Sequence, residues 1–231
     1  MSAIAGLKQR VWTCNRELPE LGLVLQAFGN VSGIDRERGL VAIKPSGIPY
    51  HDLKVQDIVV VDLNNNVVEG RLRPSSDTRT HTYLYRSFPE IGGIVHTHST
   101  YAVAWAQALK PIPLLGTTHA DLLPADVPCT DIMSDEMIEG DYEEETGKQI
   151  VDVFTNRSYK DVPMVLVGGH GPFTWGETPE KALHHSQMLE ELARMAALTL
   201  QINPASPRLK QSLIDKHFSR KHGPDAYYGQ E

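Results

Sequence analysis

The stretch NVSGIDRERGLVAIK (residues 30–44) predicts a β-hairpin, in which NVSGI and LVAIK are the strands and DRERG is the turn. A second hairpin follows, because the apolar run DIVVVDL (57–63) is joined to VVEG (67–70) by three asparagines, and asparagine tolerates left-handed turn geometry. Consecutive hairpins imply a largely antiparallel sheet.

Helical segments are expected around these hairpins. The apolar residues of 7–18 recur at helical spacing, which predicts an amphipathic helix that Pro19 stops. Thr178 and Pro179 fit the N-cap and first position of a long helix. Further helices are expected at about 100–109, 146–155 and 209–222, strands at 94–98 and 164–169, and a loop at 117–130. The chain therefore predicts one α/β domain over residues 1–231, a three-layer αβα sandwich with a central, mostly antiparallel sheet flanked by helices.

Composition excludes several classes of function. The formal net charge of −7 argues against nucleic-acid binding, which needs a basic surface. No G-x-G-x-x-G motif opens a helix after a strand, so no nucleotide cofactor is expected. The two cysteines, Cys14 and Cys129, lie in no C-x-x-C pair, which argues against a thiolate metal site. No signal peptide or membrane span is evident, so we expect a cytoplasmic protein without membrane association.

The stretch GGIVHTHST (92–100) holds two histidines, His96 and His98, one residue apart. On a strand, residues i and i+2 lie on the same face, so both rings could bind one metal ion. Two polar histidines at a strand end fit the same pattern. His170, in VLVGGHGPF, follows a second short strand and is the candidate third ligand. Three imidazoles without thiolates favour Zn²⁺, with Mn²⁺ or Co²⁺ as alternative occupants.

Polar groups that suit an anionic substrate occur in three loops. GNVS (29–32), KPSG (44–47) and Ser75-Ser76 offer hydroxyls, backbone amides and one lysine, which suit a phosphate monoester. Each loop alone also fits an ordinary turn. Asp77, in PSSDT, is either a metal ligand or the N-cap of a helix that runs to Phe88.

The combined motifs resemble a known family. GNVS, IKPSG, PSSDT, GGIVHTHS, GTTHAD, PCT, ETG, HGPFTWG and the terminal KHG…AYYGQ are similar to the L-ribulose-5-phosphate 4-epimerases of the class II aldolase/adducin-like superfamily. The resemblance runs nearly from end to end. It implies a zinc-dependent enzyme of the same α/β fold that acts on a phosphorylated ketopentose.

The resemblance also implies roles for individual residues. The metal ligands would be His96, His98 and His170, with Asp77 as a ligand that the substrate displaces. The phosphate- and substrate-binding positions would be Asn30, Lys44, Ser46, Gly47, Ser75 and Ser76. Asp121 and Tyr228 would be the two acid/base catalysts, and Tyr228 would reach the site of a neighbouring subunit in a homotetramer. Supporting polar positions would be Glu143, His217 and Arg220.

Other functions fit parts of the same pattern. A class II aldolase acting on fuculose or rhamnulose phosphate uses the same three histidines, but fuculose-phosphate aldolases carry Glu at the position of Asp77. An adducin-like interaction module would have lost the histidines, and all three are present. Epimerases of the arabinose and ascorbate pathways share this residue set, so both pathways stay open.

Overall fold

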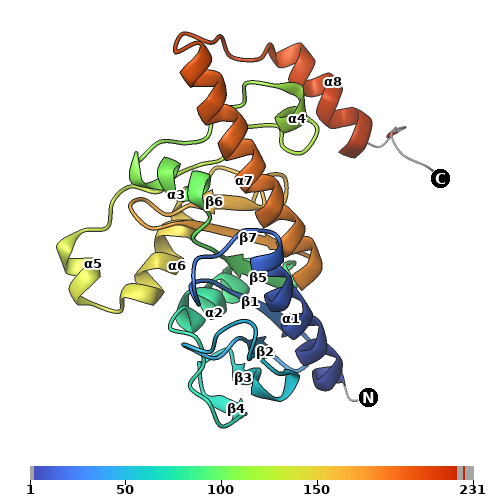
Figure 1. Cartoon of the computed structure of the whole chain (residues 1–231), viewed down its shortest axis with the longest axis vertical. Coiled ribbons are helices and arrows are strands. Elements are labelled where there is room, and N and C mark those ends of the chain that lie inside the picture. Colours follow the sequence, from blue (N-terminus) through green and yellow to red (C-terminus); the bar gives the residue numbers. More distant parts are fainter. Residues whose placement is uncertain (1–2, 223–225, 227–231) are drawn as a thin grey trace.

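The computed structural model describes residues 3–222 and residue 226, and Tyr228 lies outside this part of the chain. Within it, seven strands form one antiparallel sheet in the order β4-β3-β2-β1-β5-β7-β6 (Figure 1). The strands are β1 (Asn30–Asp35), β2 (Leu40–Ile43), β3 (Val59–Asp62), β4 (Val67–Glu69), β5 (Gly93–His96), β6 (Met164–Leu166) and β7 (Pro172–Gly176). The helices are α1 (Ala3–Glu20), α2 (Thr78–Ser87), α3 (Thr100–Gln107), α4 (Thr117–Ala120), α5 (Asp135–Glu139), α6 (Tyr142–Val153), α7 (Pro179–Ile202) and α8 (Gln211–His222).

Both predicted hairpins form. β1 pairs with β2 in the register Ser32↔Ile43, and β3 pairs with β4 across a turn in which Asn65 has a left-handed φ of 70°. The central pair joins β1 to β5, with Asn30 opposite His96. This register brings the start of the first hairpin next to the histidine motif.

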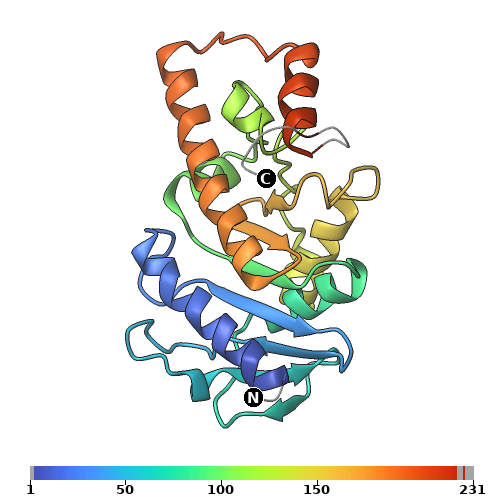
Figure 2. The same cartoon turned by 90° about the vertical axis from the view of Figure 1, so that its right-hand side faces the viewer.

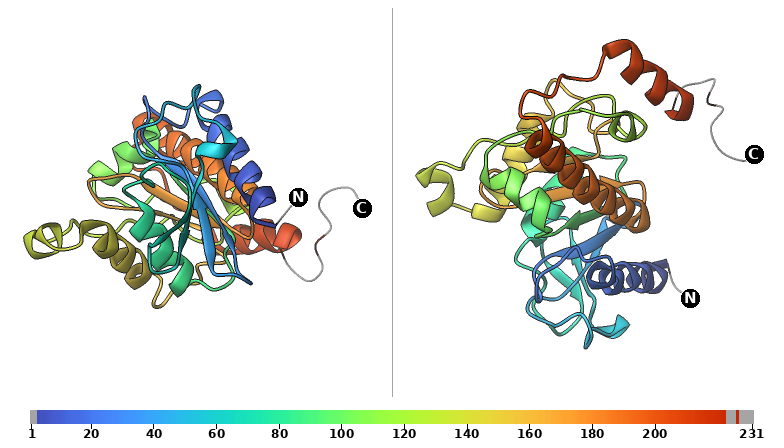
Figure 3. Two further views of the ribbon diagram at one scale, coloured as in Figure 1. Left: turned by 90° about the horizontal axis from the view of Figure 1, so that it is seen from below. Right: turned by 45° about the horizontal axis from the view of Figure 1, so that its top comes forward.

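Helices cover both faces of the sheet. Helices α1 and α7 lie side by side on one face (Figure 2), and α2 and α6 lie on the other (Figure 3). The N-terminus of α7 approaches the sheet closely: a Cβ added to Gly33 or Gly93 would lie 2.8 or 2.4 Å from Pro179. These glycines on adjacent strands therefore set the distance between α7 and the sheet. The predicted stripe of α1 (Leu7, Val11, Cys14 and Leu18) is buried.

Several boundaries differ from the sequence predictions. Helix α1 starts at Ala3, earlier than predicted, and it includes Pro19. A proline in the last turn removes one backbone donor but does not prevent that turn from closing. Residues 117–120 form the short helix α4 within the predicted loop. Strand β5 ends at His96, so His98 lies just after the strand. Strand β7 and helix α5 were not predicted, because both are short and lack a clear apolar period.

Helices α4 and α8 pack against each other at the end of the molecule away from β3 and β4 (Figure 1). The long helix α7 leads from the sheet to this end. Among the described residues, every helix is too short or too polar to cross a membrane.

Candidate metal centre

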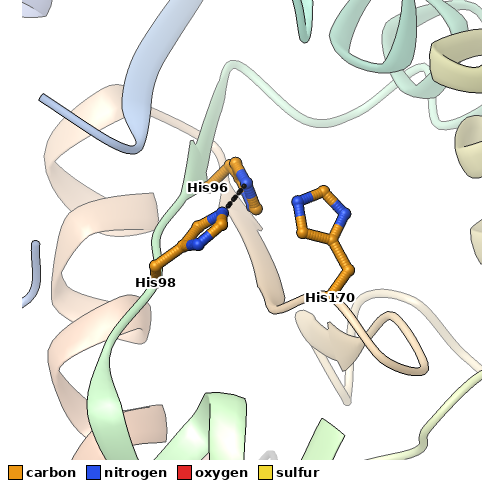
Figure 4. A group of neighbouring side chains, drawn as sticks. All are labelled: His96, His98 and His170. Carbon is orange, nitrogen blue, oxygen red and sulfur yellow. Dashed lines mark hydrogen bonds between the residues drawn. The ribbon is translucent and has the colours of Figure 1, made fainter. Parts of the chain in front are cut away.

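Three histidines converge at one end of strands β5 and β7 (Figure 4). His96 is the last residue of β5, His98 follows it, and His170 lies in the loop between β6 and β7. Their ring centroids are 4.8–5.1 Å apart, and the Nε2 atoms of His96 and His98 are 3.2 Å apart. One nitrogen of each ring lies within 4.8 Å of the others, a spacing that suits a single metal ion.

The hydrogen bonds of these rings leave nitrogen lone pairs for a metal. The Nδ1 of His96 lies 2.9 Å from the Pro172 carbonyl, which only accepts, so Nδ1–H donates and Nε2 carries a lone pair that faces His98 Nε2. The Nδ1 of His170 lies 3.3 Å from the Tyr142 hydroxyl. Burial, aided by the other two imidazoles, lowers the pKa of His170 to about 3, and burial also lowers the pKa of His98. Both shifts favour the neutral imidazole, which is the form that metal coordination requires.

Asp77 occupies the N-cap position of α2, but its side chain makes no capping hydrogen bond. Its Oδ2 accepts instead from Asn30 Nδ2 at 2.5 Å and from the Ser75 hydroxyl at 3.4 Å. Burial by itself raises the pKa of this carboxyl, but the nearby His96 and the hydrogen bond from Asn30 outweigh burial and hold it below its usual value. A charged carboxylate thus lies beside the three imidazoles, which suits a divalent cation.

One cavity of about 440 Å³ joins the histidines to the predicted anion-binding loops. Its lining includes Asn30, Lys44, Ser46, Gly47, Ser75, Ser76, Asp77, Glu143 and the three histidines. Two backbone hydrogen bonds of 3.0 Å, Ser46 N–H to Arg73 O and Ser75 N–H to Lys44 O, hold two of these loops together. The donors of these two loops therefore converge, although Lys44 and Ser76 are 32 positions apart in the sequence.

Lys44 is the buried cation of this cavity. Its side chain is 2% exposed, and its Nζ lies 3.3 Å from the Pro45 carbonyl and 4.9 Å from the centre of the Tyr50 ring. Burial lowers the pKa of Lys44 to about 8, and the charge of Asp77 offsets part of that effect. A buried ammonium with so few acceptors is suited to bind an anion.

The sequence matches the Class II Aldolase and Adducin N-terminal domain over residues 9–197. The chain belongs to the class II aldolase and adducin family. The L-ribulose-5-phosphate 4-epimerase UlaF of Salmonella paratyphi B is 54% identical over 225 residues, which cover 97% of this chain and 99% of that protein.

Solved structures of L-fuculose 1-phosphate aldolases share the fold. An L-fuculose 1-phosphate aldolase superposes with a TM-score of 0.79 at 27% identity, over 95% of this chain and 97% of its own. The L-fuculose 1-phosphate aldolase of Glaciozyma antarctica gives a TM-score of 0.76 at 19% identity, over 96% and 84% of the two chains. The predicted α/β fold with an antiparallel sheet between helices is confirmed.

The fold places three nominated residues, Asp121, His217 and Arg220, away from the histidine cavity. Asp121, at the end of α4, lies against α8: its Oδ1 is 2.9 Å from His217 Nδ1, and its carboxylate accepts three hydrogen bonds from Arg220. Burial raises the pKa of Asp121, but the bonds from His217 and Arg220 outweigh it and lower that pKa. None of these three residues lines the histidine cavity, whereas Glu143 does.

Two residues near the histidines were missed by sequence reasoning. Tyr142 lines the cavity and contacts His170. Its position directly before Glu143, a nominated residue, was the sequence feature that could have identified it. His81 is fully buried behind Asp77, and its Nδ1 lies 2.7 Å from the Ser32 hydroxyl, which lies 2.8 Å from the Tyr85 hydroxyl. Burial lowers the pKa of His81 to about 3. No sequence pattern links His81 to Ser32, because only the packing of α2 on β1 joins them.

Proposed function

We propose that this chain is an L-ribulose-5-phosphate 4-epimerase, which interconverts L-ribulose 5-phosphate and D-xylulose 5-phosphate. The observation that carries the proposal is that one cavity contains both the three-imidazole cluster and Lys44 with its hydroxyl-bearing loops. The cluster suits a metal that activates a carbonyl, and the loops suit a phosphate. The 54% identity to an L-ribulose-5-phosphate 4-epimerase supports this choice of substrate.

The proposed cofactor is Zn²⁺, held by His96, His98 and His170, with Asp77 as a ligand that the substrate displaces. The donor set fits, because three imidazoles converge without thiolates and the charged Asp77 carboxylate lies close to them. Mn²⁺ or Co²⁺ would suit the same donors. When bound, such a cation acts as a Lewis acid toward the substrate's C2 carbonyl oxygen.

The chemistry of the substrate favours bond cleavage over proton abstraction. The hydrogen on C4 is not acidic, but C4 lies β to the C2 ketone. Removal of the C4 hydroxyl proton therefore allows the C3–C4 bond to break, giving glycolaldehyde phosphate and the enediolate of dihydroxyacetone. The aldehyde rotates, the enediolate carbon attacks its other face, and the new C4 alkoxide takes a proton. Lys44 and the loops Ser46-Gly47 and Ser75-Ser76 would hold the phosphate, so that the aldehyde stays bound between the two steps.

Two acid/base groups are proposed for the two faces of C4, Asp121 and Tyr228. Asp121 does not line the cavity of its own chain, and its contacts with α8 link it to the element that precedes Tyr228 in sequence. We therefore propose that both groups act in the cavity of a neighbouring subunit of a homotetramer. His217 and Arg220 would hold Asp121 in place there. The chain would then be one domain whose C-terminal end completes the site of its neighbour.

The second candidate function is a sugar-phosphate aldolase, favoured by the structural similarity to an L-fuculose 1-phosphate aldolase at 27% identity. An aldolase needs the same metal and phosphate grip but releases the aldehyde. Asp77 is one methylene shorter than the glutamate of fuculose-phosphate aldolases, and its Oδ2 is held by Asn30 and Ser75. A carboxylate restrained in this way is suited to act as a metal ligand and not as a mobile catalytic base.

The proposal is tested by incubating the purified protein with L-ribulose 5-phosphate, and in parallel with L-fuculose 1-phosphate. We expect D-xylulose 5-phosphate from the first substrate, loss of that activity with a chelator, and its return with Zn²⁺. Rapid cleavage of L-fuculose 1-phosphate without epimerisation of L-ribulose 5-phosphate would favour the aldolase.

A further inference from the structure

Helix α3 begins immediately after the histidine motif, and its first turn is capped from another helix. Ser99 occupies the N-cap position, but its side chain makes no capping hydrogen bond. Glu190 of α7 takes that role: its Oε1 accepts from Tyr101 N–H at 2.8 Å and its Oε2 from Ala102 N–H at 2.9 Å. Both donors belong to the first turn, which has no partners within its own helix.

The same helix connects the segments that carry two of the three histidines. At its N-terminus, only Ser99 separates His98 from Thr100, the first residue of α3. Near its C-terminus, the Ala106 carbonyl accepts a 2.9 Å hydrogen bond from Gly169 N–H, directly before His170. A displacement of α3 would therefore move the backbone next to both ligands.

Helix α3 is held on α7 by two polar contacts. One is the Glu190 carboxylate, and the other is the 3.0 Å hydrogen bond from Trp105 Nε1 to the Ala193 carbonyl one turn further on. The contact of Glu190 is the nearer one to His98. A carboxylate at a helix N-terminus is also favoured by the helix dipole.

We propose that Glu190 is a positioning residue of the metal centre, which fixes the nitrogens of His98 and His170 through α3. The inference rests on the metal-dependent function proposed above. Glu190 is absent from the lining of the histidine cavity, so within the described chain it acts on the centre only through the backbone that it holds. Metal ligands need supporting groups that restrain them to within about 0.5 Å, and residues behind the ligands are known to set metal affinity.

The test compares the Zn²⁺ dissociation constants of the wild-type protein and the Glu190→Gln variant, by competition with a chromophoric chelator. An amide accepts on one atom only, so one of the two N–H groups of α3 loses its partner. We expect Zn²⁺ affinity to fall about 10-fold, the lower end of the 10–100-fold range for groups that hydrogen-bond metal ligands directly, because Glu190 acts one step further from the ligands. The Glu191→Gln variant is the matched control, because Glu191 pairs with Arg194 at the surface and should leave affinity within twofold of wild type.

Enzyme activity is a second measurement on the same variants. Excess Zn²⁺ should restore the activity of Glu190→Gln, because the ligands themselves are intact. The Glu190→Asp variant shortens the side chain by one methylene, and its Zn²⁺ affinity should lie between those of the wild-type protein and Glu190→Gln. It replaces Glu190→Gln as the test variant if Glu190→Gln does not fold. Wild-type affinity in both Glu190 variants, or an equal loss in Glu191→Gln, would overturn the inference. Failure of the wild-type protein to bind Zn²⁺, Mn²⁺ or Co²⁺ would instead refute the proposed metal-dependent function.

Discussion

Replacement of Lys44 by Met should weaken substrate binding and, at the same time, stabilise the protein. The lysine is 2% exposed, and its Nζ donates to the Pro45 carbonyl at 3.3 Å. Losing one charged partner of a phosphate costs about 1.5–3 kcal/mol, which corresponds to an increase in KM of about 10–150-fold. Metal content should not change, because Lys44 is not among the proposed ligands.

The stability effect follows from the pKa of the buried lysine. Burial lowers this pKa from 10.5 to about 8. That difference corresponds to roughly 3 kcal/mol of unfolding free energy, at about 1.36 kcal/mol per pKa unit. Below pH 8 the folded protein holds a buried charge, and Lys44→Met removes this penalty in full. Between pH 8 and 10.5 the unfolded chain binds more protons at this lysine than the folded chain, so wild-type stability rises with pH.

The assay is urea unfolding of both proteins from pH 7 to pH 10.5, with KM and metal content measured at pH 7. The variant should be more stable at pH 7, and its advantage should shrink toward pH 10.5. Lys54→Met, a change at an exposed lysine, is the control for removal of a positive charge. Unchanged KM and kcat would refute the phosphate-binding role. A stability difference that does not vary with pH would refute the buried-charge argument.

Three further predictions concern the metal and the acid/base groups. His96→Ala, His98→Ala and His170→Ala should each lose bound metal and activity, and full metal content in all three by elemental analysis would show that the site is misassigned. Asp121→Asn and Tyr228→Phe should each reduce kcat about 10²–10⁴-fold with metal content unchanged, and near-wild-type rates would remove them from the mechanism. Mixing Asp121→Asn with His98→Ala subunits should restore activity, whereas mixing Asp121→Asn with Tyr228→Phe should not. Activity in the second mixture alone would place Asp121 in the site of its own chain.

The hairpins and the long helices could be predicted from the sequence because their signals are local. The asparagine turn before β4 and the Thr178 cap of α7 depend on neighbouring residues only, and both form as predicted. Strand β7 was missed because its residues are buried on both faces and show no alternation. The first turn of α1 was missed because Ala3–Gly6 carries little of the apolar stripe.

Some residues of the candidate site could also be predicted from local sequence signals, and others could not. The three histidines could be predicted from their spacing and their positions after strands, and they do converge. The strand argument for His98 was wrong in detail, because β5 ends at His96, and the pairing of β5 with β7 is what brings the rings together. Tyr142 and Glu190 make their contacts with segments that are distant in the sequence, which no sequence pattern records. Resemblance alone nominated Asp121, and the structure adds its contacts with α8.

The most direct test of the epimerase mechanism is the reaction of L-ribulose 5-phosphate in D₂O, followed by NMR of carbon 4 of the product. Cleavage and re-formation of the C3–C4 bond invert C4 without breaking its C–H bond. The account predicts D-xylulose 5-phosphate that keeps protium at C4, formed only while the metal is present. Deuterium at C4 would contradict the cleavage mechanism, and absence of D-xylulose 5-phosphate from the metal-loaded protein would contradict the proposed function itself.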